Sequence, residues 1–370
     1  MFHTLMTIGY LVPNIYLFLR IKNLFIDKEY RLVYTIVYLL VALIYPLTII
    51  FAGEEVGSVA SVIEVISGYL LPFYLYVFML VLFLDIFLLI NFALKIFPAR
   101  VMRTSRYRKF CLPVIMLLSI SIVVAGIVNF NTIRTSEYSI AVPAKSSGIK
   151  NLKIAFVADF HLNGRISLSF VEKFAKKIHE INPDLMIYGG DMVEGDRGDG
   201  NLESFARILS GISTKYGVFG VLGNHEYYYG GDKGNFFSMA GMTMLNDTVD
   251  IIDGAFSLAG RKDSHFRGRK SLPQILSLSP DSLPLILVDH RPTEIDFVSK
   301  TKTDVQLSGH THNGQLFPVS LITKSVYRLS WGYRKIGNTH FFVTSGIRLW
   351  GPPVRTAGKS EIMIINITFI

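Results

Sequence analysis

The sequence is poor in cysteine and in charged residues. Its one cysteine, Cys111, excludes an intrachain disulfide and any cluster of cysteine ligands around a metal. Because no two cysteines can pair, the redox compartment cannot be read from the sequence. Charged residues make up only 18% of the 370 residues, whereas hydrophobic residues make up 50%. This balance predicts that a large part of the chain avoids water.

The few charged residues are unevenly distributed. Residues 1–149 contain 12 Lys or Arg and 7 Asp or Glu, whereas residues 150–370 contain 25 and 21. The net charge of +9 therefore divides into +5 and +4, and neither part carries the concentrated positive charge of a nucleic-acid-binding protein. The second part has the balance of an ordinary globular domain, and we expect no nucleic-acid partner.

Four apolar runs in the first third are candidates to cross a bilayer, which takes about 20 helical residues. They lie at about 2–19, 32–51, 69–94 and 112–130. The first run is short and interrupted by Pro13 and Asn14, so a cleaved signal peptide is its alternative. No Lys or Arg precedes this run, and Arg20 and Lys22 follow it, which favours a retained span. We therefore expect a transmembrane region at residues 1–130.

The loops between these runs predict the orientation. Lys and Arg collect in the first and third loops, whereas the second loop has none and carries two glutamates. Cytoplasmic loops are enriched in Lys and Arg, so loops one and three are expected inside. With four spans, everything after residue 130 then lies outside a multi-pass cell membrane. Asp85, within the third run, is expected to bond a tyrosine or amide of a neighbouring helix, with a substrate role as the alternative; the candidates are Tyr34, Tyr38, Tyr45 and Asn91.

The remaining residues predict a linker followed by a layered domain. Residues 131–149 contain Ser, Thr, Pro and Gly and are expected to form a linker. Beyond it, the apolar run 152–158 is typical of a buried strand, and apolar residues recur on one helical face at Phe170, Phe174, Ile178 and Ile181. Further short apolar runs alternate with helical patterns. We therefore predict an α/β domain at residues 150–370.

Five strand-like runs end in polar residues that can bind a metal. They are Asp159 with His161, Asp191, Asn224 with His225, His290, and His310 with His312. Side chains at i and i+2 leave a strand on the same side, and ligands gather beyond the carboxyl ends of strands in open α/β sheets. Nitrogen and oxygen ligands without sulfur suit manganese, iron or zinc. Seven such ligands are too many for one ion and fit two, an arrangement that serves phosphatases and nucleases.

These residues belong to five ordered motifs: "DFH" (159–161), "GGD" (189–191), "GNHE" (223–226), "DHRP" (289–292) and "GHTH" (309–312). Together they resemble the calcineurin-like metallophosphoesterase family over about residues 150–370. The resemblance implies a four-layer α/β/β/α sandwich that holds two divalent ions, with manganese preferred and iron or zinc as alternatives. It further implies attack on phosphorus by a metal-bound hydroxide, without a covalent phosphoenzyme.

The resemblance also implies a role for each residue. Asp159, His161 and His312 would hold one ion. Asn224, His290 and His310 would hold the other, with Asp191 bridging the two. His225 would be the catalytic residue that meets the leaving-group oxygen or a phosphoryl oxygen. The chain departs from the family at two positions that are not ligands, with Ala158 where Ser is frequent and Asn313 where membrane-associated relatives often have Gly.

The segments after the last motif resemble membrane-associated members of the family and supply candidate substrate residues. These are Tyr327, Arg348, Trp350 and Arg355. Arginine forks suit phosphate, and tryptophan suits an interface or a sugar face.

The whole pattern predicts an outward-facing phosphoesterase that acts on lipid or lipid-linked substrates, because four spans exceed what tethering needs. A general phosphodiesterase or phosphatase merely tethered to the membrane is the alternative, and a non-catalytic receptor is disfavoured by the full ligand set. The lipid, the choice between monoester and diester, and the oligomeric state stay open.

Overall fold

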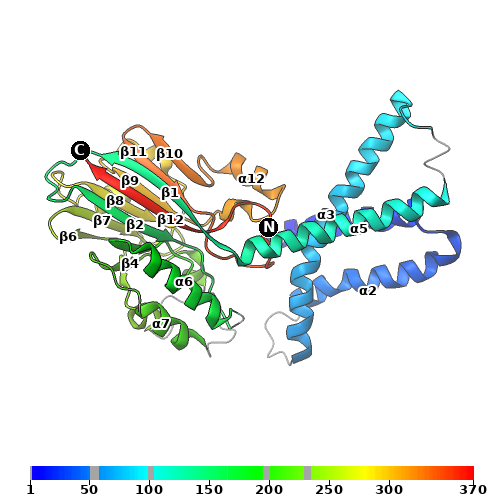
Figure 1. Ribbon diagram of the computed structural model, residues 1–370, viewed down its shortest axis with the longest axis horizontal. Helices are drawn as coiled ribbons and strands as arrows, with labels where there is room; N and C mark the ends of the chain where they lie inside the picture. The colour runs from blue at the N-terminus through cyan, green and yellow to red at the C-terminus, as the bar shows by residue number, and fades with distance from the viewer. Residues whose placement is uncertain (1, 51–57, 99–103, 165, 195–200, 229–234) are drawn as a thin grey trace. The chain divides into compact units, whose positions relative to one another are not determined.

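The computed structural model describes residues 2–370 except 51–57, 99–103, 165, 195–200 and 229–234 (Figure 1). The chain divides into two compact units. The helical unit comprises Met1–Val128 and Gly351–Thr356, and the α/β unit comprises Asn129–Trp350 and Ala357–Ile370. A short C-terminal segment therefore packs with the helical unit, although it lies far from the helices in the sequence.

The helical unit is built from long apolar helices. They are α1 (Phe2–Leu24), α2 (Arg31–Ile50), α3 (Ser58–Leu94) and most of α5 (Ser105–Asn131), with a short 3-10 helix at Lys28–Tyr30 before α2. Within the described residues, three stretches are long and apolar enough to cross a membrane, namely Lys28–Thr48, Val62–Leu94 and Lys109–Asn131. They correspond to the second, third and fourth predicted spans. Helix α1 is not among them, so the first span stays a prediction.

Asp85 of α3 is paired with helix α1. Its Oδ2 atom accepts a hydrogen bond from Nε of Arg20 at 2.7 Å and another from the Tyr16 hydroxyl. A tyrosine or an amide was expected as the partner, and a tyrosine is found, but it is none of the four candidates Tyr34, Tyr38, Tyr45 and Asn91. The hydroxyls of Tyr34 and Tyr38 instead donate to backbone carbonyls of α1, and Arg20 lies within α1 rather than in the first loop. Asp85 therefore ties two helices together.

The α/β unit contains two six-stranded mixed sheets. The order in the first sheet is β1 (Ile133–Val142), β12 (Ser360–Phe369), β2 (Asn151–Val157), β3 (Leu185–Tyr188), β4 (Val218–Gly220) and β5 (Thr243–Met244). The order in the second sheet is β10 (Gly332–Ile336), β11 (Thr339–Val343), β9 (Val305–Ser308), β8 (Leu285–Asp289), β7 (Phe256–Arg261) and β6 (Thr248–Ile252). Strands β2, β3 and β4 are parallel, as are β7, β8 and β9, so each group ends at one edge of its sheet.

Three hydrophobic cores hold these elements together. One joins α6 (Leu168–Ile181), α7 (Leu202–Ser210) and α9 (Phe236–Met239) to the first sheet. A second contains side chains of both sheets, and a third joins α10 (Leu272–Leu276) and α11 (Ile295–Val298) to the second sheet. Phe170, Phe174 and Ile178 of α6 are buried, as their four-residue spacing predicts.

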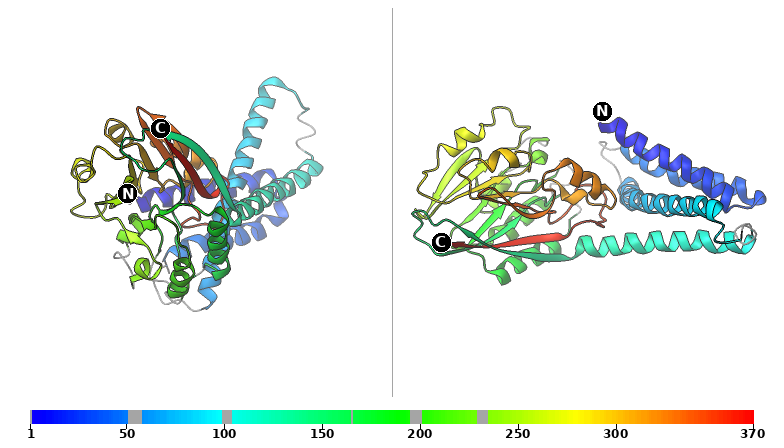
Figure 2. Two further views of the ribbon diagram at one scale, coloured as in Figure 1. Left: turned by 60° about the vertical axis from the view of Figure 1, so that its left-hand side comes forward. Right: turned by 90° about the horizontal axis from the view of Figure 1, so that it is seen from above.

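The predicted linker at residues 131–149 is wrong over most of its length. Strand β1 pairs in parallel with β12 over ten residues, from Ile133 opposite Ser360 to Val142 opposite Phe369, and Figure 2 shows the two strands side by side. Only three of its residues are buried, Ser136, Ile140 and Val142. An edge strand with so few apolar positions has the composition of a loop, and its partner lies at the far end of the chain.

Candidate metal centre

The five motifs follow the carboxyl ends of five strands. Asp159 comes two residues after β2, Asp191 three residues after β3, and His290 directly after β8. Asn224 begins the short helix α8 (Asn224–Tyr228) beyond β4, and His310 comes two residues after β9. Both sheets therefore contribute candidate ligands, the first sheet after β2, β3 and β4 and the second after β8 and β9.

The structure brings the predicted ligands together in overlapping groups. Ligand atoms of Asp159, His161 and His312 all lie within 4.8 Å of one another, and so do those of Asp191, His290 and His310. A further group, within the same distance, joins His161 and Asp191 to His225. The first two groups coincide with the two predicted ligand sets, apart from Asn224. Asp191 occurs in the second and third groups and His161 in the first and third, so the three groups overlap.

Most of these residues have unusual backbone conformations. Five of the seven predicted ligands have positive φ angles between 48° and 70°: Asp159, His161, Asp191, His310 and His312. Non-glycine residues rarely adopt this left-handed region, and such strain clusters at functional sites. Asn313 is also left-handed, with φ 49°, a conformation that glycine or asparagine adopts most readily.

Buried atoms of the cluster fit a metal. Among the described residues, Oδ1 of Asn224 is buried without a hydrogen-bond partner, and an amide oxygen is a metal ligand. The Nε2 atoms of His161 and His312 face each other at 3.3 Å. Burial lowers the pKa of His310 to about 3 and that of His161 well below its usual value. These imidazoles are therefore neutral, which is the form that binds metals.

His290 lies where a cation is favoured. Its Nε2 atom is 3.1 Å from Oδ2 of Asp191 and 4.0 Å from Oδ1 of Asp159. Burial alone would lower the pKa of His290, but the charge of Asp191, a hydrogen bond to it and the charge of Asp159 raise it to about 10. Its Nδ1 atom lies 2.7 Å from the carbonyl oxygen of Gly189, a contact that orients Nε2 toward the carboxylates.

Glu226 organises the centre, and sequence reasoning did not assign it a role. Its buried carboxylate accepts backbone hydrogen bonds from Asp191 at 3.0 Å, Met192 at 2.6 Å, Val193 at 3.1 Å and Gly223 at 2.7 Å. Burial, and next the charge of Asp191, raise the pKa of Glu226 to about 7. The carboxylate joins the loop after β3 to the loop after β4. The sequence feature that could have pointed to Glu226 is its position as the last residue of the motif "GNHE".

Arg291 was also missed, although it belongs to "DHRP". Its Nε atom donates to the buried Oδ2 of Asp263 at 2.7 Å, which fixes the guanidinium. Burial is the main cause that lowers the pKa of His225 and of His310. The positive charge of His290 and then that of Arg291 lower both pKa values further. Its positive charge therefore acts on both sides of the cluster.

Two of the predicted substrate residues border the cluster. The rings of Trp350 and His225 have centroids 6.2 Å apart, and those of Tyr327 and His310 are 6.3 Å apart. Tyr228 lies 5.8 Å from His225 by the same measure. Trp350 and Tyr228 are 42% and 53% exposed, so they form an accessible aromatic rim beside His225.

The structure places the two predicted arginines differently. The Arg348 guanidinium carbon lies over the rings of Phe130 and Phe170, at 4.4 and 4.5 Å from their centroids. Its backbone N–H still donates to the carbonyl of Asp159 at 3.0 Å. Arg355 is fully buried and belongs to the Gly351–Thr356 segment of the helical unit, where its backbone N–H donates to the carbonyl of Gly126.

Comparison with known proteins shows what the part of the chain around the cluster is similar to. Residues 152–314 match the calcineurin-like phosphoesterase family, and this range contains every predicted ligand. This stretch resembles a calcineurin-like phosphoesterase domain. It also contains the Asp and His groups that could hold a metal ion.

Proteins similar to this chain include one that is named a transmembrane protein. An uncharacterized metallophosphoesterase of Helicobacter pylori is 33% identical over 226 residues, which cover 59% of this chain and 60% of that protein. One of Campylobacter jejuni is 26% identical over 370 residues, covering 96% of this chain and 95% of that protein. A Danio rerio protein, named transmembrane protein with metallophosphoesterase domain, is 26% identical over 265 residues, covering 67% of this chain and 60% of that protein. The chain thus spans about 60% of the length of the first and third relatives.

Proposed function

We propose that this chain is a membrane-anchored hydrolase of phosphoesters that uses two divalent metal ions, with manganese preferred. The observation that carries the proposal is the sharing of Asp191 between groups of converging ligand atoms. The order of the three hydrophobic cores supports a four-layer α/β/β/α sandwich as the scaffold. Iron and zinc suit the same nitrogen and oxygen ligands.

The residues divide into two ligand sets. Asp159, His161 and His312 would hold one ion, and Asn224, His290 and His310 the other, with Asp191 between them. Bound ions of this kind activate water and neutralise the charge that develops on a phosphoryl group.

Other side chains would act on the substrate. His225 is neutral at neutral pH, because burial lowers its pKa, so one of its ring nitrogens carries a proton to donate to a phosphoryl or leaving-group oxygen. Its backbone N–H donates to Oδ1 of Asp191 at 2.8 Å, which fixes its place beside the cluster. Arg291, held by Asp263, presents a guanidinium of the kind that binds phosphate oxygens in pairs.

Exposed apolar side chains around the centre support a lipid or lipid-linked substrate. Trp350 and Tyr228 lie beside His225, and such rings favour the boundary between water and lipid. The helix α12 (Val319–Val326), which follows the last ligands, carries exposed apolar side chains at Val319, Leu321, Ile322 and Val326.

Charge supports an outward-facing metal centre. The segment between α3 and α5 is rich in Lys and Arg, which favours the cytoplasmic side. The span Lys109–Asn131 would then carry the rest of the chain across. The metal centre would then face outward whether or not α1 spans the membrane.

The test is hydrolysis by the full-length protein in detergent with added manganese. We expect phosphate or headgroup release from some members of a panel of membrane phospholipids, faster than from soluble p-nitrophenyl esters. The Asp191→Asn variant should lose both the activity and the bound metal. Equal or faster cleavage of soluble esters would favour a tethered general phosphoesterase. No hydrolysis of any phosphoester by the metal-loaded protein would favour a receptor and overturn the proposal.

A further inference from the structure

A second candidate site lies in a cavity of the α/β unit separate from the metal ligands. Its volume is about 520 Å³, and it is lined by residues of three segments: Asn131, Thr132 and Ile133; Ser167, Ser169, Phe170, Lys173 and Lys177; and Arg348. None of the seven predicted ligands is among them. The lining combines three cations with hydroxyl groups and two apolar side chains.

The cations of this cavity are arranged to receive an anion. Ser169, Lys173 and Lys177 follow one another at four-residue spacing on α6, so their side chains share one face of the helix. Within the described part of the chain, no carboxylate lines the cavity, and neither lysine forms an ion pair. The Arg348 guanidinium lies over two phenylalanine rings, which orients it at the edge of the same helix.

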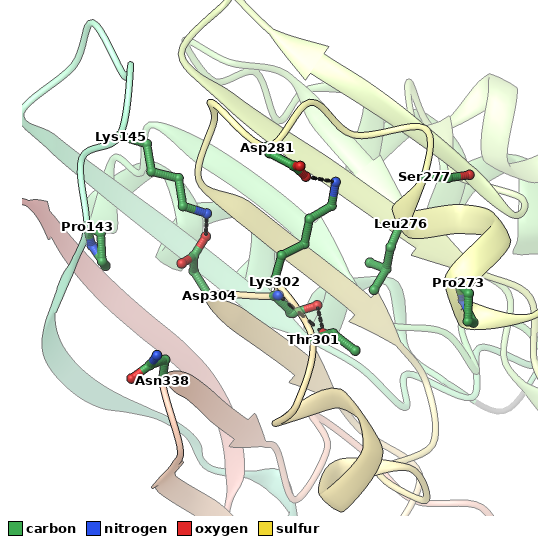
Figure 3. A pocket seen from close by; sticks show the side chains of 11 residues that line it. Pro143, Lys145, Pro273, Leu276, Ser277, Asp281, Thr301, Lys302, Asp304 and Asn338 are labelled. Atoms are coloured by element: carbon green, nitrogen blue, oxygen red, sulfur yellow. Dashed lines mark hydrogen bonds and ion pairs between the residues drawn. The ribbon is translucent and has the colours of Figure 1, made fainter.

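A second cavity of the same unit provides a contrast (Figure 3). It also contains two lysines, but each has an acidic partner: Nζ of Lys145 lies 2.7 Å from Asp304, and Nζ of Lys302 lies 2.5 Å from Asp281. Its positive charge is therefore neutralised within the protein. The cavity around Lys173 and Lys177 keeps its positive charge for a ligand.

The position of the cavity in the chain indicates the source of that ligand. Asn131, at its edge, is the last residue of the candidate span Lys109–Asn131. Where a span ends, the headgroups of the bilayer begin. Ile133 and Phe170 add apolar surface suited to the glycerol and first methylene groups of a lipid.

We infer that this cavity binds the phosphate group of an anionic membrane lipid. The site does not depend on the proposed hydrolysis. One hydrogen bond links the cavity to the candidate metal centre. Arg348, whose side chain lines the cavity, donates its backbone N–H to the carbonyl of Asp159. A bound headgroup would therefore hold the α/β unit at the bilayer through residues adjoining a predicted metal ligand.

The test measures lipid binding to the full-length, manganese-loaded protein in detergent by native mass spectrometry. The probes are phosphatidylglycerol, zwitterionic phosphatidylcholine and inorganic phosphate. The variant is Lys173→Gln with Lys177→Gln. The matched control removes the same charge from exposed lysines outside the cavity, as Lys176→Gln with Lys150→Gln.

We expect phosphatidylglycerol to bind the variant about thirtyfold more weakly than the wild type, since each lysine near an anionic lipid contributes roughly a factor of five. The control should bind within about twofold of the wild type, and both should cleave a soluble phosphodiester at the wild-type rate. Unchanged phosphatidylglycerol binding by the variant would overturn the site. Equal binding of phosphatidylcholine, or displacement of the lipid by inorganic phosphate at equal concentration, would overturn its assignment to an anionic lipid. Because the readout is binding, loss of the site and absence of hydrolysis are separate results.

Discussion

A Cβ atom on Gly223 would lie 2.1 Å from Oδ1 of Asp191, so the loops after β3 and β4 approach each other as closely as their backbones allow. The same oxygen accepts the backbone N–H of His225 at 2.8 Å. The carboxylate of Asp191, which lies in two of the three groups of converging ligand atoms, is therefore positioned by the loop after β4. Glycine at residue 223 is required by this close approach.

Replacing Gly223 with alanine should displace Asp191 and remove bound metal. A shift of about 1 Å at a reacting centre costs on the order of a hundredfold in rate, and we expect at least that loss. Metal content by mass spectrometry and the rate on a soluble phosphodiester measure the effect. Gly148→Ala is the control, because a Cβ atom there meets nothing within 4 Å. Wild-type metal content and rate in Gly223→Ala would contradict this account.

Glu226→Gln keeps the shape of the side chain but replaces one acceptor oxygen with an NH2 group, and each of the two oxygens accepts two of the four backbone N–H groups. A buried N–H group left without an acceptor costs about 1–3 kcal/mol, so the free energy of unfolding should fall by about 1.5–3 kcal/mol. In a domain of this size the melting temperature should fall by roughly 3–12 °C. Glu172→Gln, an exposed position of α6, should leave it unchanged. A variant as stable as the wild type would show that Glu226 does not hold the two loops together.

His225→Ala should separate catalysis from metal binding. General acid–base groups contribute about 10²–10⁴-fold, and kcat should fall by this factor while the metal content stays at the wild-type level. His179→Ala, an exposed histidine of α6, is the matched control and should change neither. Loss of metal together with activity would instead make His225 a ligand, consistent with its group with His161 and Asp191.

The pairing of Arg20 with Asp85 should be visible as thermodynamic coupling in the full-length protein. Arg20→Ala and Asp85→Ala each leave one charge of the pair unmatched, so each should lower the melting temperature in detergent. The double variant should lose less than the sum of the two, with a coupling of about 0.5–3 kcal/mol. Additive losses would mean that the pair does not hold α1 to α3.

The sequence predicts the convergence of the candidate ligands better than their surroundings. Residues such as Asp159, Asp191 and His290 lie within three residues of the ends of apolar strands, and parallel strands end at a common edge, so local patterns suffice to expect convergence. Local sequence patterns do not predict the residues that hold these ligands in place. Glu226 acts through backbone groups of a different loop, and nothing in the local pattern of Asp263 indicates that it holds Arg291.

Pairings between distant segments account for the other failures. Strand β1 is stabilised by β12, which forms only when the end of the chain returns to its beginning. Three of the four candidate partners of Asp85 lie on α2, but the structure provides the partners on α1, because helix α1 continues past Arg20 to Leu24. The local composition of these segments predicts neither the pairing of β1 with β12 nor the bond between Arg20 and Asp85.

The pairing of β1 with β12 also determines where the chain can be shortened. A protein that begins near residue 150 would keep all seven predicted ligands but lose Ile133–Val142, leaving ten residues of β12 as an open sheet edge. Open edges recruit strands from other molecules, so such a fragment would be prone to aggregate. Its inactivity would then reflect self-association, and would be mistaken for a requirement for the membrane. A fragment that starts at Asn129 keeps the edge covered and is the sounder basis for asking what the helices contribute.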